Sequence, residues 1–291
     1  MRNKFRTPVF CEYPILNNAH IMAIFHLIDS KPTALIVPDE NDERNAVALA
    51  KLFIAKGVPF HIAADESMMG SGLEEFREYV INILTERAFS PHIIVDCHIT
   101  AADDEVLLDA AQFFPDVPVL ASTPHTTSSR LYSVLNNPNI ARINLLPGFF
   151  PTMQTIEFAP SPTMSEDACL HAEQFLNGVG LQVERIDDIV GFVAPRIVAM
   201  LVNEAAFAVM EDVSSAEEID AAMRLGTNYP QGPLAWADDI GIDVVLFMLD
   251  ALHTEYRQER YRACRLLRKY VALGWIGKSV GKGFYEYDDE Q

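Results

Sequence analysis

Apolar residues in the first 190 positions occur in short β-branched runs, separated by segments long enough for a helix. Residues 33–37 (TALIV) form one such run, and residues 43–56 follow with apolar residues at helical spacing up to Gly57. A second run at 58–63 completes a βαβ unit. Further strands are predicted at 92–99, 117–122 and 141–146. Strands that alternate with helix-length segments indicate a parallel sheet in an α/β domain.

The pattern changes near residue 188, after which helical spacing dominates. Helices are predicted at 192–211, 215–225, 242–256 and 261–273. Ser214 and Glu217 predict a capping box for the second helix, and Gly226 predicts its end. The run Leu225–Leu234, with two prolines and two glycines, predicts a fixed turn between helices. We therefore expect two domains, an α/β domain at 1–188 and an all-α domain at 189–291.

The composition of the chain limits the kinds of molecule that it is expected to bind. A chain of 291 residues with a net charge of −19 has too acidic a surface to favour nucleic acid or an anionic membrane, and it also disfavours small polyanions. The four cysteines are scattered without a CxxC pair, so neither a disulfide framework nor a metal site is expected. The N-terminus does not resemble a signal peptide, and no apolar run is long enough for a transmembrane helix. We expect a cytoplasmic protein.

Two segments near the C-terminus contain a series of short motifs in a fixed order. Residues 214–243 hold an acidic helix start, a Leu-Gly stop, a Pro-x-Gly-Pro turn and a Gly-Ile-Asp step, and residues 274–288 (GWIGKSVGKGFYEYD) hold a Gly-x-Gly-Phe-Tyr tail. This order resembles the C-terminal domain of 3-hydroxyacyl-CoA dehydrogenases. The resemblance implies a Rossmann-like first domain, NAD as cofactor, an acyl-CoA ligand, a place in fatty acid metabolism, and a homodimer built largely through the helical domain.

The cofactor turn departs from this family. A GxGxxG turn lets the backbone approach the pyrophosphate at the start of a helix. Here residues 37–43 read VPDENDE, with no glycine and four carboxylates. Those carboxylates are predicted to cap the helix and to repel a diphosphate, so no bound cofactor is expected. Asp65 matches the position of the family's ribose-binding acidic residue and is either a cofactor contact or a turn residue.

The catalytic segment is also incomplete. The family pattern resembles HFFNPxPxMxxVE, in which a histidine base is oriented by a glutamate twelve residues later. Residues 145–157 align with it, and the residues that fit are Pro151, Met153 and Glu157. The histidine position is Leu145 and the asparagine position is Gly148. Glu157 is thus a candidate catalytic residue without the base that it would orient.

Other candidate catalytic residues lie nearby in the sequence. The loop resembling the family's NTSSL contains Ser128 and Ser129. These serines either contact the substrate, as the resemblance implies, or cap a helix. His125 is the best candidate for a relocated base, with His98 second. In the segment resembling PGFVxNRI, Pro195 replaces the asparagine and offers no polar side-chain atom.

Three hypotheses remain open from the sequence. The chain is a pseudoenzyme that binds acyl-CoA or forms a dimer; or it is an active NAD(P)-dependent oxidoreductase with a rebuilt site; or it is a scaffold for another small ligand. The glycine-free turn and Leu145 favour the first, because the loss of glycines, base and asparagine together is hard to reconcile with hydride transfer.

Overall fold

Short apolar runs form one eight-stranded sheet in the computed structural model, which describes residues 33–39, 42–64, 70, 72–82, 90–99 and 105–287. The strands are β1 (Ala34–Val37), β2 (Phe60–Ala63), β3 (Val80–Ile81), β4 (Ile93–Asp96), β5 (Val119–Ala121), β6 (Ile140–Ile143), β7 (Thr155–Pro160) and β8 (Gln182–Arg185). Their order is β3-β2-β1-β4-β5-β6-β7-β8, and only the β6–β7 pair is antiparallel. Successive strands leave from β1 in both directions, so the carboxyl ends of β1 and β4 flank a switch point, where such sheets bind ligands.

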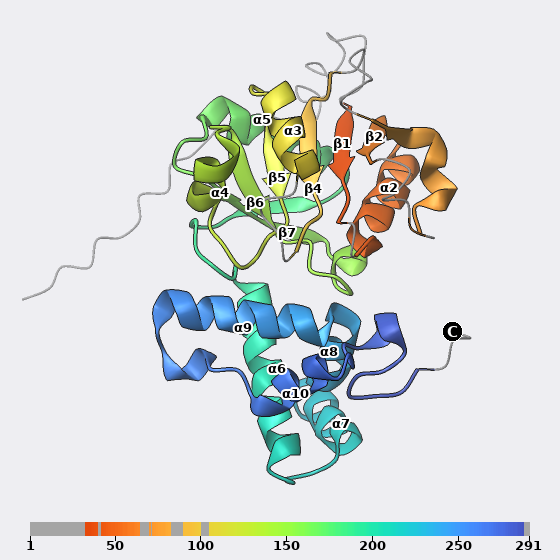
Figure 1. Ribbon diagram of the computed structural model, residues 1–291, viewed down its shortest axis with the longest axis vertical. Helices are drawn as coiled ribbons and strands as arrows, with labels where there is room; N and C mark the ends of the chain where they lie inside the picture. Colours follow the sequence, from red (N-terminus) through yellow and green to blue (C-terminus); the bar gives the residue numbers. More distant parts are fainter. Residues whose placement is uncertain are drawn as a thin grey trace, which may run out of the picture. The chain divides into compact units, whose positions relative to one another are not determined.

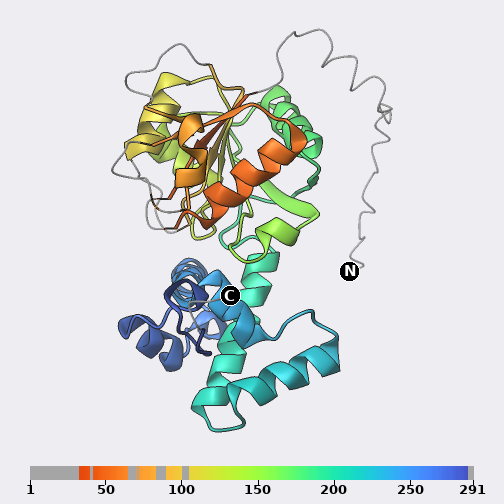
Figure 2. The same cartoon turned by 90° about the vertical axis from the view of Figure 1, so that its right-hand side faces the viewer.

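Helices cover both faces of this sheet (Figures 1 and 2). On one face lie α2 (Arg44–Lys56), the 3₁₀ turn η2 (Glu74–Tyr79) and α5 (Glu166–Gly178), and on the other lie α3 (Glu105–Phe113) and α4 (Ser128–Leu135). The rings of Phe53 on α2 and Phe175 on α5 meet edge to face at 5.7 Å. The central strands β1, β4, β5 and β6 are buried along their whole length, which explains why they are mostly apolar rather than alternating, whereas the edge strand β8 is largely exposed.

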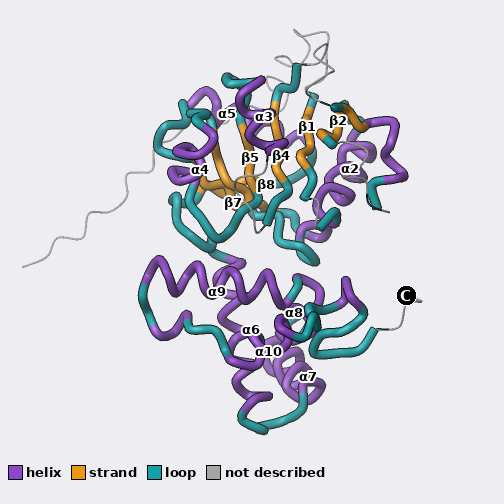
Figure 3. Tube along the Cα trace, in the orientation of Figure 1, coloured by secondary structure: helices purple, strands orange, loops and turns teal. Residues whose placement is uncertain are grey.

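After β8 the described chain contains helices and no further strand (Figure 3). The elements are α6 (Ala194–Met210), α7 (Ala216–Thr227), α8 (Pro233–Ile240), α9 (Ile242–Tyr256), η4 (Glu259–Tyr261), α10 (Arg265–Ala272) and η5 (Lys278–Val280). Apolar side chains of α6, α8, α9 and α10 share one buried cluster. No helix in the described ranges is both long and apolar enough to span a bilayer.

Two buried aspartates hold the C-terminal turn in place. Asp238 accepts hydrogen bonds from the Phe284 and Tyr285 amides, both at 2.9 Å. Asp220 accepts bonds from the amides of Leu234 and Ala235 and from the Tyr285 hydroxyl. The glycines of the tail motif follow from this packing, because a Cβ at Gly283 would lie 2.0 Å from Asp238 Oδ1.

The predicted fold class is confirmed, with a mostly parallel sheet followed by helices. The predicted capping box is one residue out of place: Ser215 is the N-cap of α7 and pairs with Glu218, because Ser215 has the extended backbone that a cap needs. Gly226 does not end this helix, which continues to Thr227 and stops at the left-handed Asn228. Part of the expected turn is also wrong, since Pro233 begins α8.

The division at residue 188 stays a prediction. The last strand ends at Arg185 and the first long helix begins at Ala194. The connection is fastened to the sheet, since Gly191 donates its amide proton to the Pro124 carbonyl at 2.7 Å. The change from strands to helices therefore takes place within a short, well-bonded segment.

Candidate active site

The turn between β1 and α2 folds back on itself. Asp39 and Asp42 form an isolated antiparallel bridge, in which the Asp42 amide donates to the Asp39 carbonyl at 3.2 Å. The Asp39 side chain is buried and lies 3.5 Å from the Ile99 amide of the neighbouring strand end. Pro38 follows β1 directly and has no amide proton to offer a ligand. The described part of the turn thus makes its polar contacts within the protein.

The expected capping by the turn carboxylates is only partly right. Glu43 is the N-cap of α2 but makes no side-chain cap hydrogen bond, because its backbone is already helical. Its carboxylate instead accepts the Gly72 amide at 2.9 Å. Asp42 accepts the Arg44 amide at 3.1 Å, so one carboxylate of the turn does satisfy a helix-start amide.

Arg44, the first residue of α2, connects this turn to the helical region. Its guanidinium donates to both carboxylate oxygens of Asp42, at 2.8 and 2.7 Å. It also donates to the backbone carbonyls of Asp239 and Ile240, at 2.7 and 2.9 Å. These carbonyls end α8, where the helix dipole favours a cation. We call this set of contacts the Arg44 clasp.

Leu145, at the family's histidine position, is a core residue. Its side chain is 1% exposed within the cluster that includes α2 and α5. Its carbonyl accepts the side-chain amide of Asn45 at 2.7 Å, and Asn45 is itself buried. The start of α2 is therefore bonded directly to the segment that would supply the catalytic base.

Glu157 binds the start of a helix. It lies on β7, and its two oxygens accept the amides of Val193 and Ala194 at 2.7 and 2.8 Å. These amides belong to the first turn of α6, which has no side-chain cap at Val193. A carboxylate in this place satisfies open amides and complements the positive end of the helix dipole. This contact gives Glu157 a structural role, while Leu145 occupies the family's histidine position.

Ser128 and Ser129 begin α4 but are not its cap. Thr127 is the N-cap and accepts the Arg130 amide. The Ser128 hydroxyl donates to the Ala159 carbonyl at 2.6 Å, and the Ser129 hydroxyl donates to Asp188 at 2.7 Å. The expected capping role is therefore misplaced by one residue, and both hydroxyls are engaged within the protein.

Asp188 is a site residue that the sequence did not single out. It accepts the amides of Ser128 and Ser129 and lies 3.3 Å from the guanidinium of the fully buried Arg142. Burial raises the pKa of Asp188, but the hydrogen bonds from Ser129 and Ser128 outweigh it and leave the pKa below its usual range. Burial lowers the pKa of Arg142 to about 10. The isolated arginine in an otherwise apolar strand was the available signal.

The two candidate histidines differ in accessibility. The Nδ1 of His98 lies 2.5 Å from Asp96, and the residue is 2% exposed. The Nδ1 of His125 lies 3.0 Å from the Ile99 carbonyl, which fixes the proton on Nδ1 and leaves Nε2 as an acceptor. Burial lowers the pKa of His125, and the charges of Arg142 and Arg130 act in the same direction. His125 also contacts the half-exposed ring of Phe247 at 4.6 Å.

Two other positions complete the inventory. Pro195 is buried in the first turn of α6, where it fits because the first turn does not need its amide proton. Asp65, the candidate cofactor contact, lies outside the described residues. Among the described residues no group of three or more His, Cys, Asp and Glu side chains is placed to hold a metal ion.

Sequence comparison relates the chain to acyl-CoA enzymes. Residues 191–287 match the family model for the 3-hydroxyacyl-CoA dehydrogenase C-terminal domain. A probable 3-hydroxybutyryl-CoA dehydrogenase of Bacillus subtilis is 35% identical over 191 residues, which is 65% of this chain and 67% of the relative. A 3-hydroxybutyryl-CoA dehydrogenase of Bradyrhizobium diazoefficiens is 35% identical over 60% of this chain and 59% of its own length.

Solved structures support the same fold. M. tuberculosis FadB2 superposes with a TM-score of 0.77 at 19% identity, covering 89% of this chain and all of that one. The (S)-3-hydroxybutyryl-CoA dehydrogenase PaaH1 of Ralstonia eutropha gives 0.70 at 22% identity, again over 89% of this chain and all of the other. At these identities the likeness extends to the fold alone.

Proposed function

Because the chain belongs to the 3-hydroxyacyl-CoA dehydrogenase family, we propose that it is a member that does not perform NAD-dependent hydride transfer and acts by binding acyl-CoA or by forming a dimer. The observation that carries this proposal is the Arg44 clasp. It fills the start of α2 with protein contacts where a dinucleotide fold presents open amides to a pyrophosphate.

The residues at this turn do not fit a dinucleotide. Arg44 would attract a diphosphate, but Asp42 neutralises its charge at 2.7 Å and its guanidinium points to the carbonyls that end α8. A phosphate beside Asp42 would be opposed by about 1 kcal/mol per charge pair even in a water-like medium. Releasing Arg44 would leave the carbonyls of Asp239 and Ile240 without this donor. Cofactor binding would therefore have to break an existing network.

The catalytic segment also argues against hydride transfer. Leucine cannot accept a proton, and Leu145 lies in the core. The carboxylate of Glu157 is bound through both oxygens by α6. The family's histidine and glutamate transfer a proton together. Here Leu145 only packs in the core, and Glu157 connects β7 to α6, the first helix of the all-α region.

Acyl-CoA binding is supported by what the relatives act on. The names of matched proteins include 3-hydroxybutyryl-CoA and 3-hydroxyadipyl-CoA dehydrogenases, all acting on CoA thioesters. Such a ligand would place the chain in acyl-CoA metabolism. The highly acidic surface works against the phosphates of CoA, so we expect weaker binding than in a relative with a basic cleft.

Homodimer formation is supported by exposed apolar side chains in the helical region. They include Leu225 at 87%, Val213 at 69% and Val280 at 50%. Asp220 is the only buried residue of α7. An amphipathic helix with so little buried surface is typical of an element that packs against another molecule. Sedimentation equilibrium should give twice the chain mass, and a monomer across the micromolar range would contradict the dimer.

Two titrations test the loss of hydride transfer. NADH fluorescence should show no saturable binding up to about 1 mM, whereas acetoacetyl-CoA should give a measurable calorimetric isotherm. Acetoacetyl-CoA reduction followed at 340 nm should stay at the background rate. Micromolar NADH affinity would overturn the proposal that the turn after β1 does not bind a dinucleotide. Absence of any acetoacetyl-CoA binding would overturn the proposal that the protein binds acyl-CoA.

The Leu145→His variant separates a missing base from a missing cofactor site. It should not restore reduction of acetoacetyl-CoA, because the start of α2 stays closed by the Arg44 clasp. Turnover regained by this single change would mean that the cofactor turn is competent and that only the base was lost.

An active NAD(P)-dependent enzyme with a rebuilt site is the second candidate, and His125 is the observation in its favour. Its neutral imidazole has a fixed Nδ1 proton and an acceptor Nε2, as a general base requires. Reduction at 340 nm that disappears in His125→Gln would establish this alternative. A scaffold for an unrelated small ligand is the third, and it predicts that neither NADH nor acetoacetyl-CoA binds.

A further inference from the structure

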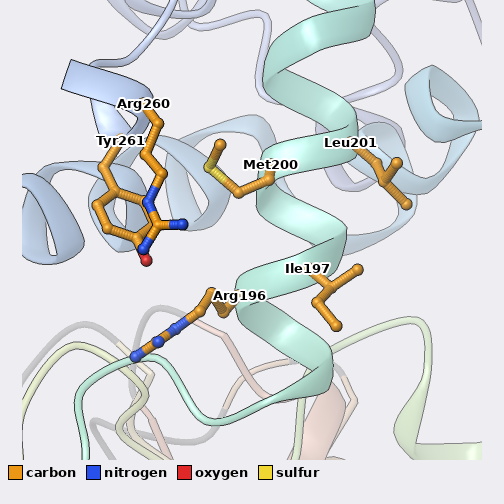
Figure 4. Close-up of a pocket in the computed structure, with 6 residues that line it drawn as sticks. All are labelled: Arg196, Ile197, Met200, Leu201, Arg260 and Tyr261. Atoms are coloured by element: carbon orange, nitrogen blue, oxygen red, sulfur yellow. The ribbon is translucent and has the colours of Figure 1, made fainter. Parts of the chain in front are cut away.

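A small cavity lies between α6 and η4, in the helical region and away from the turn after β1. Its volume is about 280 Å³ and it is lined by Arg196, Ile197, Met200, Leu201, Arg260 and Tyr261. Figure 4 shows Arg196, Met200, Arg260 and Tyr261 on the same side of α6, with Met200 directed toward Arg260. Two guanidinium groups thus border a cavity whose other lining side chains are mostly apolar.

Arg196 is held rigidly at one end of the cavity. One terminal nitrogen, Nη2, donates to the Val190 carbonyl and to the Tyr256 hydroxyl, the latter at 2.9 Å. The guanidinium also lies 4.9 Å above the Tyr256 ring. Its Nε is buried and has no hydrogen-bond partner among the described residues. This atom lies against Gly191, so only the terminal nitrogens of the Arg196 guanidinium are available to a ligand in the cavity.

Arg260 borders the cavity from η4. Its guanidinium stacks on the Tyr261 ring at 4.7 Å. The neighbouring carboxylate of Glu259 pairs with Arg262 at 3.4 Å rather than with Arg260. Within the described ranges neither Arg196 nor Arg260 has a carboxylate partner, although acidic residues outnumber basic ones by 41 to 22. Two arginines without counter-charges in so acidic a chain indicate a preference for an external anion.

We propose that this cavity binds a small carboxylate with an apolar chain of about four to eight carbons. The volume corresponds to roughly nine waters at ~30 Å³ each, which suits the eight non-hydrogen atoms of hexanoate. Guanidinium groups bind carboxylates through paired charge-assisted hydrogen bonds. Met200, on the same side of α6 as the two arginines, supplies apolar surface for the chain, and Ile197 and Leu201 line the cavity from the other side of the helix. The site is independent of the cofactor turn, so it stands or falls separately from the proposed loss of hydride transfer.

The test uses ¹³C-methyl methionine NMR on the full chain, with the Met200 signal assigned through Met200→Leu. Hexanoate should shift this signal saturably, with a Kd on the order of 1 mM. Hexanamide, which has the same shape and no charge, should bind at least tenfold more weakly. Arg260→Ala should weaken hexanoate binding about tenfold. Arg260 is exposed, so this replacement should leave the fold intact. Arg262→Ala is the matched control, because Arg262 is paired with Glu259 and does not line the cavity.

Three results would overturn the proposal. The first is equal binding of hexanoate and hexanamide, which would show that the arginines do not recognise charge. The second is unchanged affinity in Arg260→Ala. The third is a Met200 signal that ignores hexanoate but moves on dilution of the protein, which would show that a second copy of the chain covers the cavity.

Discussion

Replacing Glu157 by glutamine should lower stability in a predictable way. The carboxylate accepts the amides of Val193 and Ala194 at 2.7 and 2.8 Å. Glutamine keeps one acceptor oxygen and presents an NH₂ group to the other amide, so one charge-assisted hydrogen bond becomes a donor–donor contact. The loss should amount to about 2 kcal/mol, from the cost of losing a helix cap and a hydrogen bond to a charged group. For a chain of this length we expect Tm to fall by roughly 3 °C.

The assay is thermal unfolding followed by circular dichroism, with Glu184→Gln as control. Glu184 is opposite Glu157 in the β7–β8 register and is exposed, so its variant should stay within about 1 °C of the parent. A Glu157→Gln protein that melts with the control would refute the capping role. Loss of turnover without any change in melting would identify Glu157 as an orienting residue of a working active site.

Other perturbations test the remaining contacts. Gly277→Ala should destabilise the fold by more than about 2 kcal/mol, because Gly277 has φ +120° and a Cβ there would lie 2.4 Å from the Asp238 carbonyl oxygen. Gly226→Ala should stabilise the fold by about 0.5–1 kcal/mol, because Gly226 lies in helix α7 and a Cβ there would have no atom within 4 Å. Chemical denaturation of both variants measures these changes, and the opposite order would contradict the reasoning. Burial raises the pKa of Asp238 to about 6, so the folded state binds this proton more tightly than the unfolded state. The free energy of unfolding should therefore fall as pH rises from about 4 to about 6. Urea midpoints measured across this range should fall less steeply in Asp238→Asn. Arg44→Met should cost about 1–2 kcal/mol and raise hydrogen exchange around 239–241, and unchanged exchange there would argue against the Arg44 clasp.

The architecture followed from the sequence because apolar runs and helix-stop glycines report local structure directly. Gly57 is left-handed at the end of α2, as its position after an amphipathic run predicts. The cap of α7 was misplaced by one residue, at Ser214 instead of Ser215, because neighbouring serines compete for the same cap. Helix α8 (Pro233–Ile240) was not predicted. Pro233 was read as part of a turn although proline is also favoured in the first turn of a helix.

The site was less accessible to sequence reasoning because its key contacts join distant segments. The Arg44 contacts with Asp239 and Ile240 span 195 and 196 residues, and they involve backbone carbonyls that no side-chain pattern reveals. Asp188 likewise meets Ser129 across 59 residues. The resemblance identified what was missing, such as the histidine at Leu145, but only the packing shows how the remaining groups are used.

The Arg44 clasp has a consequence for how the molecule responds to heat and to small molecules. Enzymes commonly leave polar groups unsatisfied at their reaction centres and are less stable for it. Here Arg44 is paired with Asp42 and with the carbonyls that end α8, so on the proposed function the chain should unfold at a higher temperature than a hydride-transferring relative of equal size. Nicotinamide dinucleotides should raise the melting temperature of that relative and leave the melting temperature of this chain unchanged.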